Sequence, residues 1–75
     1  MFREEPFRFF FFSREEPRRH VHVFSPEGEA KFWLEPSIEL AVVKGVSDKT
    51  LKRIEEIIVE RKEEIIHAWN RHFSS

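Results

Sequence analysis

The sequence predicts an α+β domain, in which an antiparallel meander of three or four strands packs one long C-terminal helix on one face. Two observations predict this class. The first half contains short segments of alternating or aromatic residues separated by turn residues, and the second half contains an apolar stripe at helical spacing. The chain has 75 residues and no cysteine, so we expect a single domain, residues 1–75, without disulfide support.

The first strand is expected at residues 7–13, after a polar lead-in at residues 1–6. Phenylalanines occur on both faces of this strand. A strand with two apolar faces is typical of a sheet covered on both sides, whereas one helix covers only one side. We therefore expect a chain end or another protomer to cover the second face. If another protomer covers it, the protein is a homo-oligomer.

The other strands are expected up to residue 43. Residues 20–24 and 29–35 flank a Ser-Pro-Glu-Gly turn, in which proline suits the first corner and Gly28 suits a position with positive φ. Residues 38–43 alternate in a way that favours a fourth strand, with a helical turn leading into Gly45 as the alternative.

The turn allows two registers for the hairpin. If only the two corner residues form the loop, His22 faces Lys31 and His20 faces Trp33. A three-residue loop with a glycine bulge instead places both histidines beside the apolar residues of the next strand. We favour the first register, because a buried histidine pair needs hydrogen-bond partners that the adjacent sequence does not offer.

The helix is expected at residues 47–73, with Ser47 as its N-cap and Asp48 at the positive end of its dipole. Its apolar residues recur on one face as a core-facing stripe: Leu51, Ile54, Ile57, Ile58, Ile65, Ile66, Trp69 and Phe73. A straight helix of this length spans roughly 38 Å, whereas six-residue strands span about 20 Å. We therefore expect its last turns to extend past the sheet and contact a partner.

The chemistry-bearing stretch is His20-Val21-His22, because residues two apart on a strand point to the same face. Two imidazoles with ordinary pKa values of about 6.5 can share one proton near neutrality, as acid–base cleavage of a phosphodiester requires. Lys31 or Arg19 would then stabilise the developing negative charge. The catalytic candidates are therefore His20, His22 and Lys31.

Two other interpretations of the histidines stay open. His20 and His22 can chelate a metal if Glu29, His67 or His72 supplies a further ligand. They can also be half-exposed strand residues that pack on a neighbouring tryptophan and carry no chemistry. We expect no cofactor, and the sequence leaves open whether the protein is an enzyme.

A binding surface is the third kind of candidate site. Trp33 is a large aromatic residue on the non-core face of the favoured register, with Arg19 and Glu29 nearby. The net charge of −1 and the mixed charges exclude a general nucleic-acid binder, although a local RNA contact remains open. The apolar run at residues 9–12 is too short for a signal or membrane segment, so we expect a cytoplasmic protein.

Several segments together carry a family resemblance. They are His-Val-His-Val at residues 20–23, the short glycine turn, Glu-Ala-Lys-Phe-Trp-Leu-Glu-Pro at residues 29–36, the aromatic run at residues 8–11, and a C-terminal helix that contains tryptophan. In these segments the chain resembles the small prokaryotic family catalogued as domain of unknown function 4160, over about residues 7–73. It departs from that family at the Arg18-Arg19 pair, where uncharged residues are expected.

The resemblance implies a genomic context for the protein, but it implies no established activity. Genes of that family often adjoin genes of another small family, domain of unknown function 2442, in an arrangement similar to toxin–antitoxin pairs. This implies a small partner protein and an action on RNA or translation. We expect a protein-interaction component of such a two-gene module; the alternatives are a ribonuclease-type toxin using His20 and His22, and a metal-binding module through the same residues.

Overall fold

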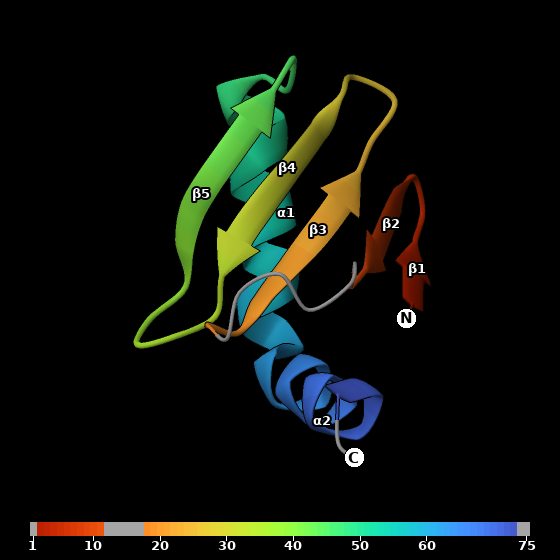
Figure 1. Cartoon of the computed structure of the whole chain (residues 1–75). Coiled ribbons are helices and arrows are strands. Elements are labelled where there is room, and N and C mark those ends of the chain that lie inside the picture. The colour runs from red at the N-terminus through yellow and green to blue at the C-terminus, as the bar shows by residue number, and fades with distance from the viewer. Residues whose placement is uncertain (1, 12–17, 74–75) are drawn as a thin grey trace.

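The computed structural model describes residues 2–11 and 18–73. Five strands precede two helices along the described chain (Figure 1): β1 (Phe2–Glu4), β2 (Phe7–Phe10), β3 (His20–Phe24), β4 (Glu29–Trp33), β5 (Glu39–Lys44), α1 (Asp48–Glu60) and α2 (Lys62–Phe73). The predicted α+β class is confirmed. Five strands and two helices take the place of the expected three or four strands and single helix.

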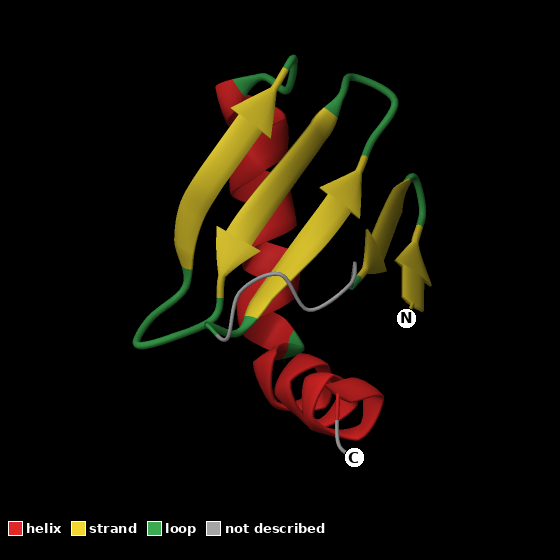
Figure 2. Ribbon diagram, in the orientation of Figure 1, coloured by secondary structure: helices red, strands yellow, loops and turns green. Residues whose placement is uncertain are grey.

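The strands form one antiparallel sheet in the order β1-β2-β3-β4-β5, so each strand is bonded to its neighbour in sequence. Helix α1 lies on one side of this sheet, α2 lies below the ends of the strands, and no described helix covers the other side (Figure 2). We call the side without helices the outer face. Among the described residues, no helix has the length and apolar character needed to cross a membrane.

The polar lead-in contains a strand that was not expected from the sequence. Residues 2–4 form β1, which pairs with β2 so that Glu4 lies opposite Phe7. Pairing satisfies backbone groups on that side of β2, which an unpaired strand would leave open. The expected first strand is shorter in the structure, ending at Phe10, and residues 12 and 13 lie outside the described part of the chain.

The core lies between the sheet and the helices. Its buried side chains alternate along the strands and recur at helical spacing: Phe7, Phe9, Val21, Val23, Ala30, Phe32, Leu34, Val46, Ile54, Ile57, Ile58 and Ile65. Phe11, Ile38, Leu51 and Ile66 are partly buried against them. The expected helical stripe and the inner faces of β3 and β4 are therefore confirmed. Burial of this apolar surface is the main stabilising contribution in a domain of this size.

The helical region bends at Arg61, so the expectation of one long helix is corrected. Arg61 ends α1 with φ −111° and ψ 22°. Its N–H donates to the Ile57 carbonyl at 3.0 Å, and its own carbonyl accepts from Ile65 at 2.9 Å, so backbone bonding continues through the bend. The bend brings Ile65 and Trp69 into the protein interior. The last turns therefore pack on their own chain, because that contact removes their apolar surface from water.

The start of α1 is held against the β3–β4 turn. Ser47 is the N-cap, as predicted, and its hydroxyl accepts from the Thr50 N–H at 3.3 Å. The Glu27 carboxylate accepts from the Ser47 N–H at 2.9 Å and from the Thr50 hydroxyl at 2.6 Å. The hydrogen bond from the Ser47 backbone is the main reason that the pKa of Glu27 is lowered, followed by the bond from Thr50.

The role expected for Gly28 is corrected by this contact. The positive φ belongs to Gly45, at 77°, and not to Gly28. Glycine is required at position 28 for a different reason: a Cβ there would overlap the carbonyl oxygen of Lys44. The turn and the loop that leads into α1 therefore approach each other backbone to backbone.

Candidate functional site

The β3–β4 register determines which side chains share the outer face. His20 pairs with Trp33 and His22 pairs with Lys31, as the two-residue loop requires. The Ser25 N–H donates to the Gly28 carbonyl at 2.8 Å, which closes that loop. The favoured register is therefore confirmed, and His22 and Lys31 are neighbours on the outer face.

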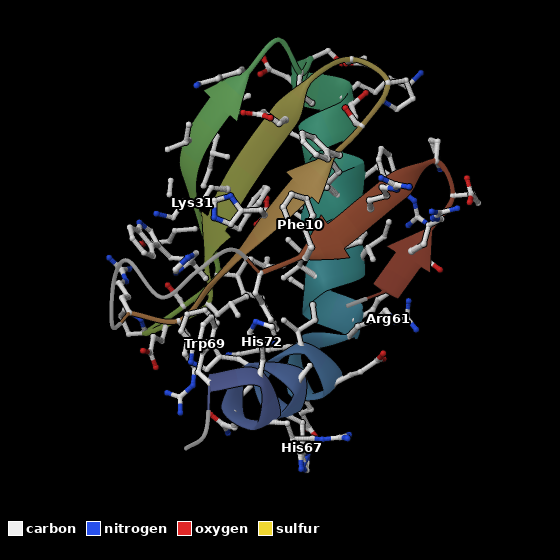
Figure 3. The ribbon with its side chains drawn as sticks, turned by 45° about the vertical axis from the view of Figure 1, so that its right-hand side comes forward. Phe10, Lys31, Arg61, His67, Trp69 and His72 are labelled. Atoms are coloured by element: carbon white, nitrogen blue, oxygen red, sulfur yellow. The ribbon has the colours of Figure 1, made fainter. Side chains whose placement is uncertain are left out.

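A hollow of about 160 Å³ lies on the outer face above β3, β4 and β5. Its lining contains apolar, basic and acidic side chains: Phe10, His22, Glu29, Ala30, Lys31, Val42 and Lys44. Figure 3 shows Phe10 and Lys31 on the same side of the sheet. The hollow therefore combines apolar contact area with charged groups at its margin, as small binding surfaces do.

A row of rings borders this hollow. The Phe24 and Phe10 centroids lie 5.1 Å apart, and the Phe10 and His22 rings stack with centroids 5.8 Å apart. Phe24 remains 41% exposed, although the side chain is large and apolar. The rings come from β2 and β3 because Phe10 pairs with His22 across the two strands. The row presents apolar surface that a binding partner can cover.

Trp33 is covered by two cations and is only half-buried. The Arg18 guanidinium carbon lies 4.3 Å from the ring centroid, and the Lys31 ammonium lies 4.5 Å from it. These contacts are within the usual range of cation–π attraction. They hold Lys31 over the strand end and place cations where a stacking base would lie. In this structure the Trp33 ring therefore holds the Lys31 ammonium in place, and it is not open for a base to stack on.

His20 is buried, with only 2% of the residue exposed. Its Nδ1 lies 2.8 Å from the Arg18 carbonyl oxygen. The rings of His22, Trp33 and Trp69 meet it edge-on, with centroids 5.3, 5.8 and 5.0 Å away respectively. Trp69 reaches this position because α2 folds back below the strand ends. His20 therefore fills the space between the sheet and α2.

This burial makes the two candidate catalytic histidines differ in accessibility, although their ring centroids lie only 5.3 Å apart. An acid–base pair needs both imidazoles to reach the same substrate atoms. His22 lines the outer hollow, but His20 is enclosed by aromatic rings and is not among the residues that line it. His20, His22 and Lys31 share one face of the sheet by register, but His20 is covered there by the rings of Trp33 and Trp69. The geometry assigns His20 to packing and His22 to the exposed surface.

Arg19 links β3 to the rest of the chain. Its Nη1 donates to the Glu35 carboxylate at 2.9 Å, its Nη2 donates to Asn70 of α2 at 2.9 Å, and its backbone N–H donates to Glu35 at 3.2 Å. That backbone bond is the main cause of the lowered pKa of Glu35, followed by the guanidinium bond. Arg19 therefore holds strand and helix together. Of the three residues predicted for the binding surface, Trp33, Arg19 and Glu29, it is Glu29 that lines the hollow.

The candidate third ligands for a metal lie apart. Within residues 2–11 and 18–73, no three side chains of the ligating types are placed to hold a metal ion. His72 packs on Phe11, with ring centroids 5.7 Å apart. His67 lies on the side of α2 that faces away from the sheet (Figure 3). The described residues thus offer His20 and His22 no third ligand, which is what a structural zinc site needs.

Four contributors to the outer hollow were not among the candidates from sequence: Phe10, Ala30, Val42 and Lys44. The signal for Phe10 was present, since the first strand was apolar on its second face. Val42 and Lys44 depend on the β4–β5 register, which shifts between Lys31 and Phe32. A one-residue shift reverses the facing of the following residues, and strand alternation alone does not reveal it.

The family comparison agrees with the resemblance seen in the sequence. The family model described as Domain of unknown function (DUF4160) matches residues 7–70. These residues include the strands that form the outer hollow, all of α1, and α2 up to residue 70. No curated protein and no solved structure matches the chain.

Proposed function

The chain belongs to the family described as Domain of unknown function (DUF4160), and we propose that it is a small protein-binding module whose partner docks on the outer face of the sheet. The partner in this proposal is the small protein encoded beside it in a two-gene, toxin–antitoxin-like module. The domain acts in the cytoplasm by binding, with no reaction of its own.

The observation that supports this proposal is the exposed apolar surface around the outer hollow. Phe24 is 41% exposed and Val42 is 44% exposed, although both are large apolar side chains on strands of the sheet. Phe10 connects them across the hollow. Exposed aromatic and aliphatic residues grouped in a hollow are typical of protein contact sites.

The charges around the hollow favour a partner of particular chemistry. Lys31 and Lys44 line it together with His22, and among the described residues Glu29 is the one acidic side chain in its lining. The partner segment is therefore expected to carry apolar side chains flanked by carboxylates. Complementary charge accelerates encounter and fixes orientation, while the apolar contact supplies most of the affinity.

Binding is favoured over RNA cleavage by the position of His20. A two-histidine nuclease requires both rings at the substrate, whereas the His20 ring lies between β3 and α2. An RNA-binding surface would also need several free cations along a groove. Here the Lys31 ammonium is over the Trp33 ring, and the lining of the hollow includes a carboxylate.

The test is a calorimetric titration of the neighbouring gene's product into the wild type and two variants. Phe24→Ser removes an exposed ring from the outer face, and Val59→Ser is its matched control, because Val59 is 56% exposed on α1. We expect Phe24→Ser to weaken binding by about tenfold or more, since an anchor side chain contributes about 1.4 kcal/mol or more. Val59→Ser should bind as the wild type does.

The opposite pattern would overturn the proposal. If Val59→Ser weakened binding and Phe24→Ser did not, the partner would dock on the helical side. If neither purified protein bound the other at concentrations well above the micromolar range, the assigned partner would be wrong. Circular dichroism of both variants confirms that any loss of binding is not a loss of fold.

A further inference from the structure

The strand β5 has an open edge and apolar residues on both of its faces. It is the last strand of the sheet, bonded to β4 alone among the described strands. None of its six residues is buried, and Leu40, Val42 and Val43 are among the most exposed large apolar residues of the described chain. A strand with this composition is usually covered on both sides, and an edge of this kind is a template for another strand.

We propose that β5 pairs antiparallel with β5 of a second copy of this chain, across a two-fold axis. The strand reads Glu-Leu-Ala-Val-Val-Lys, which is complementary to itself when reversed. Glu39 then lies opposite Lys44 of the second copy, and Leu40 lies opposite Val43 of the second copy. A two-fold interface repeats each contact, so the charge pair and the apolar pair each occur twice. This inference does not depend on the proposed function.

The irregularity in β5 makes this register consistent with the faces of the sheet. Residues directly opposite one another in a sheet must lie on the same face. Glu39 pairs with Trp33 and Lys44 pairs with Glu29, so both lie on the outer face. Leu40 pairs with Phe32 and Val43 with Ala30, so both lie on the helical face. In a regular six-residue strand, the first and last residues would lie on opposite faces.

The shift occurs at Ala41, which has no partner on β4, in the middle of the strand. Ala41 lies next to the proposed two-fold axis, opposite the Ala41-Val42 pair of the second copy. The pairing thus places opposite charges beside each other on the outer face and apolar side chains beside each other on the helical face. Opposite charges and aliphatic pairs across strands each stabilise a sheet by roughly 0.2–1 kcal/mol.

The proposed dimer also joins the two outer hollows. Val42 and Lys44 belong both to β5 and to the hollow lining. Pairing of the two β5 strands therefore places the hollows on either side of the axis, on one continuous sheet. Along the outer face the charges alternate from Glu29 to Lys44 of one copy and then to Glu39 of the other. A partner with two symmetric segments would bind both hollows together.

The experiment is analytical ultracentrifugation of the full chain, whose mass is 9.1 kDa, over a range of concentrations and at low salt. We expect a reversible dimer. Glu39→Lys and Lys44→Glu each place like charges opposite one another, and each should weaken dimerisation by about tenfold, since symmetry repeats the pair. The double variant Glu39→Lys/Lys44→Glu restores opposite charges across the axis and should recover most of that loss.

Recovery in the double variant separates the proposed pairing from effects within one chain. Glu39 also approaches Arg18 of its own chain at 3.5 Å, and the double variant does not restore that contact. A wild type that stays monomeric at all concentrations would overturn the proposal. A dimer whose affinity is unchanged in the single variants, or lost further in the double variant, would overturn the β5 pairing. Lys52→Glu on α1 is the control for a change of net charge.

Discussion

The imidazole of His20 and the indole of Trp69 meet edge-on, with ring centroids 5.0 Å apart. This contact joins the start of β3 to α2. It depends on the bend at Arg61, since α2 begins at Lys62 and carries Trp69 back toward the sheet. The contact explains how one of two adjacent strand histidines is buried while the other remains on the surface.

We predict that the two histidines differ in their contribution to stability. His20→Ala removes a ring that is 2% exposed, together with its contact to the Arg18 carbonyl oxygen. It should lower the free energy of unfolding by about 2–4 kcal/mol. His22→Ala changes a partly exposed residue and should lower it by less than about 1 kcal/mol. Urea unfolding followed by circular dichroism measures both, and equal losses would contradict the packing role of His20.

We predict that the bend in the helical region depends on burial of Ile65. This side chain is fully buried, and it follows the bend. Ile65→Ala should destabilise the protein by about 2–5 kcal/mol, as truncation of a packed aliphatic residue does. Ile66→Ala, at a partly buried neighbour, is the matched control and should cost less. If the two variants unfolded at the same urea concentration, α2 would not be held by its packing.

We predict a pH-dependent contribution from Glu27. Its folded-state pKa is lowered because the carboxylate accepts hydrogen bonds from Ser47 and Thr50. A group with a lowered folded pKa adds stability above its unfolded pKa of about 4.3, and that stability is lost as the pH falls through the folded pKa. Glu27→Gln should therefore lower the melting temperature at neutral pH, and the difference from wild type should shrink in acid.

The control for Glu27 is Glu55→Gln, which also removes one exposed carboxylate, on α1. Thermal melts of the wild type and both variants across the acidic range provide the comparison. A loss in Glu27→Gln that stays constant down to the lowest pH would contradict the role of the charged carboxylate. It would indicate that the shape of the side chain alone holds the turn against α1.

We predict that Gly28→Ala is strongly destabilising. The added methyl group would overlap the Lys44 carbonyl oxygen, which is fixed in the backbone of β5. The loss should be about 3 kcal/mol, because a backbone segment must move. Gly45→Ala provides the comparison: its Cβ would lie 2.9 Å from the Glu27 carbonyl oxygen, and its φ of 77° disfavours alanine by about 1–2 kcal/mol. A neutral Gly28→Ala would mean that the turn and the end of β5 do not touch.

The parts of the fold that follow from local pattern were predictable from sequence. Strand alternation and the Pro-Glu loop led to the pairing of His22 with Lys31. The N-cap at Ser47 and the buried stripe of the helices followed from spacing and side-chain chemistry. Each of these features depends on residues close together in the chain, or on a period that one face of an element must keep.

The features that were not predictable depend on contacts between distant segments. No proline or glycine lies between residues 46 and 73, so nothing local indicated the bend at Arg61. Burial of His20 depends on Trp69, which reaches it only after that bend. The shift at Ala41 has no sequence signature either, and it determines that Val42 and Lys44 line the outer hollow.

The most direct test of partner binding is an NMR titration of the labelled domain with the neighbouring gene's product. The methyl groups of Val42 and Val59 report on opposite sides of the molecule, and both residues are well exposed. If the partner binds at the outer hollow, the chemical shifts of the Val42 methyl groups and of the Phe24 ring protons should change, and those of the Val59 methyl groups should not. Shifts at Val59, with Val42 and Phe24 unchanged, would contradict the proposal and assign the partner to the helical side.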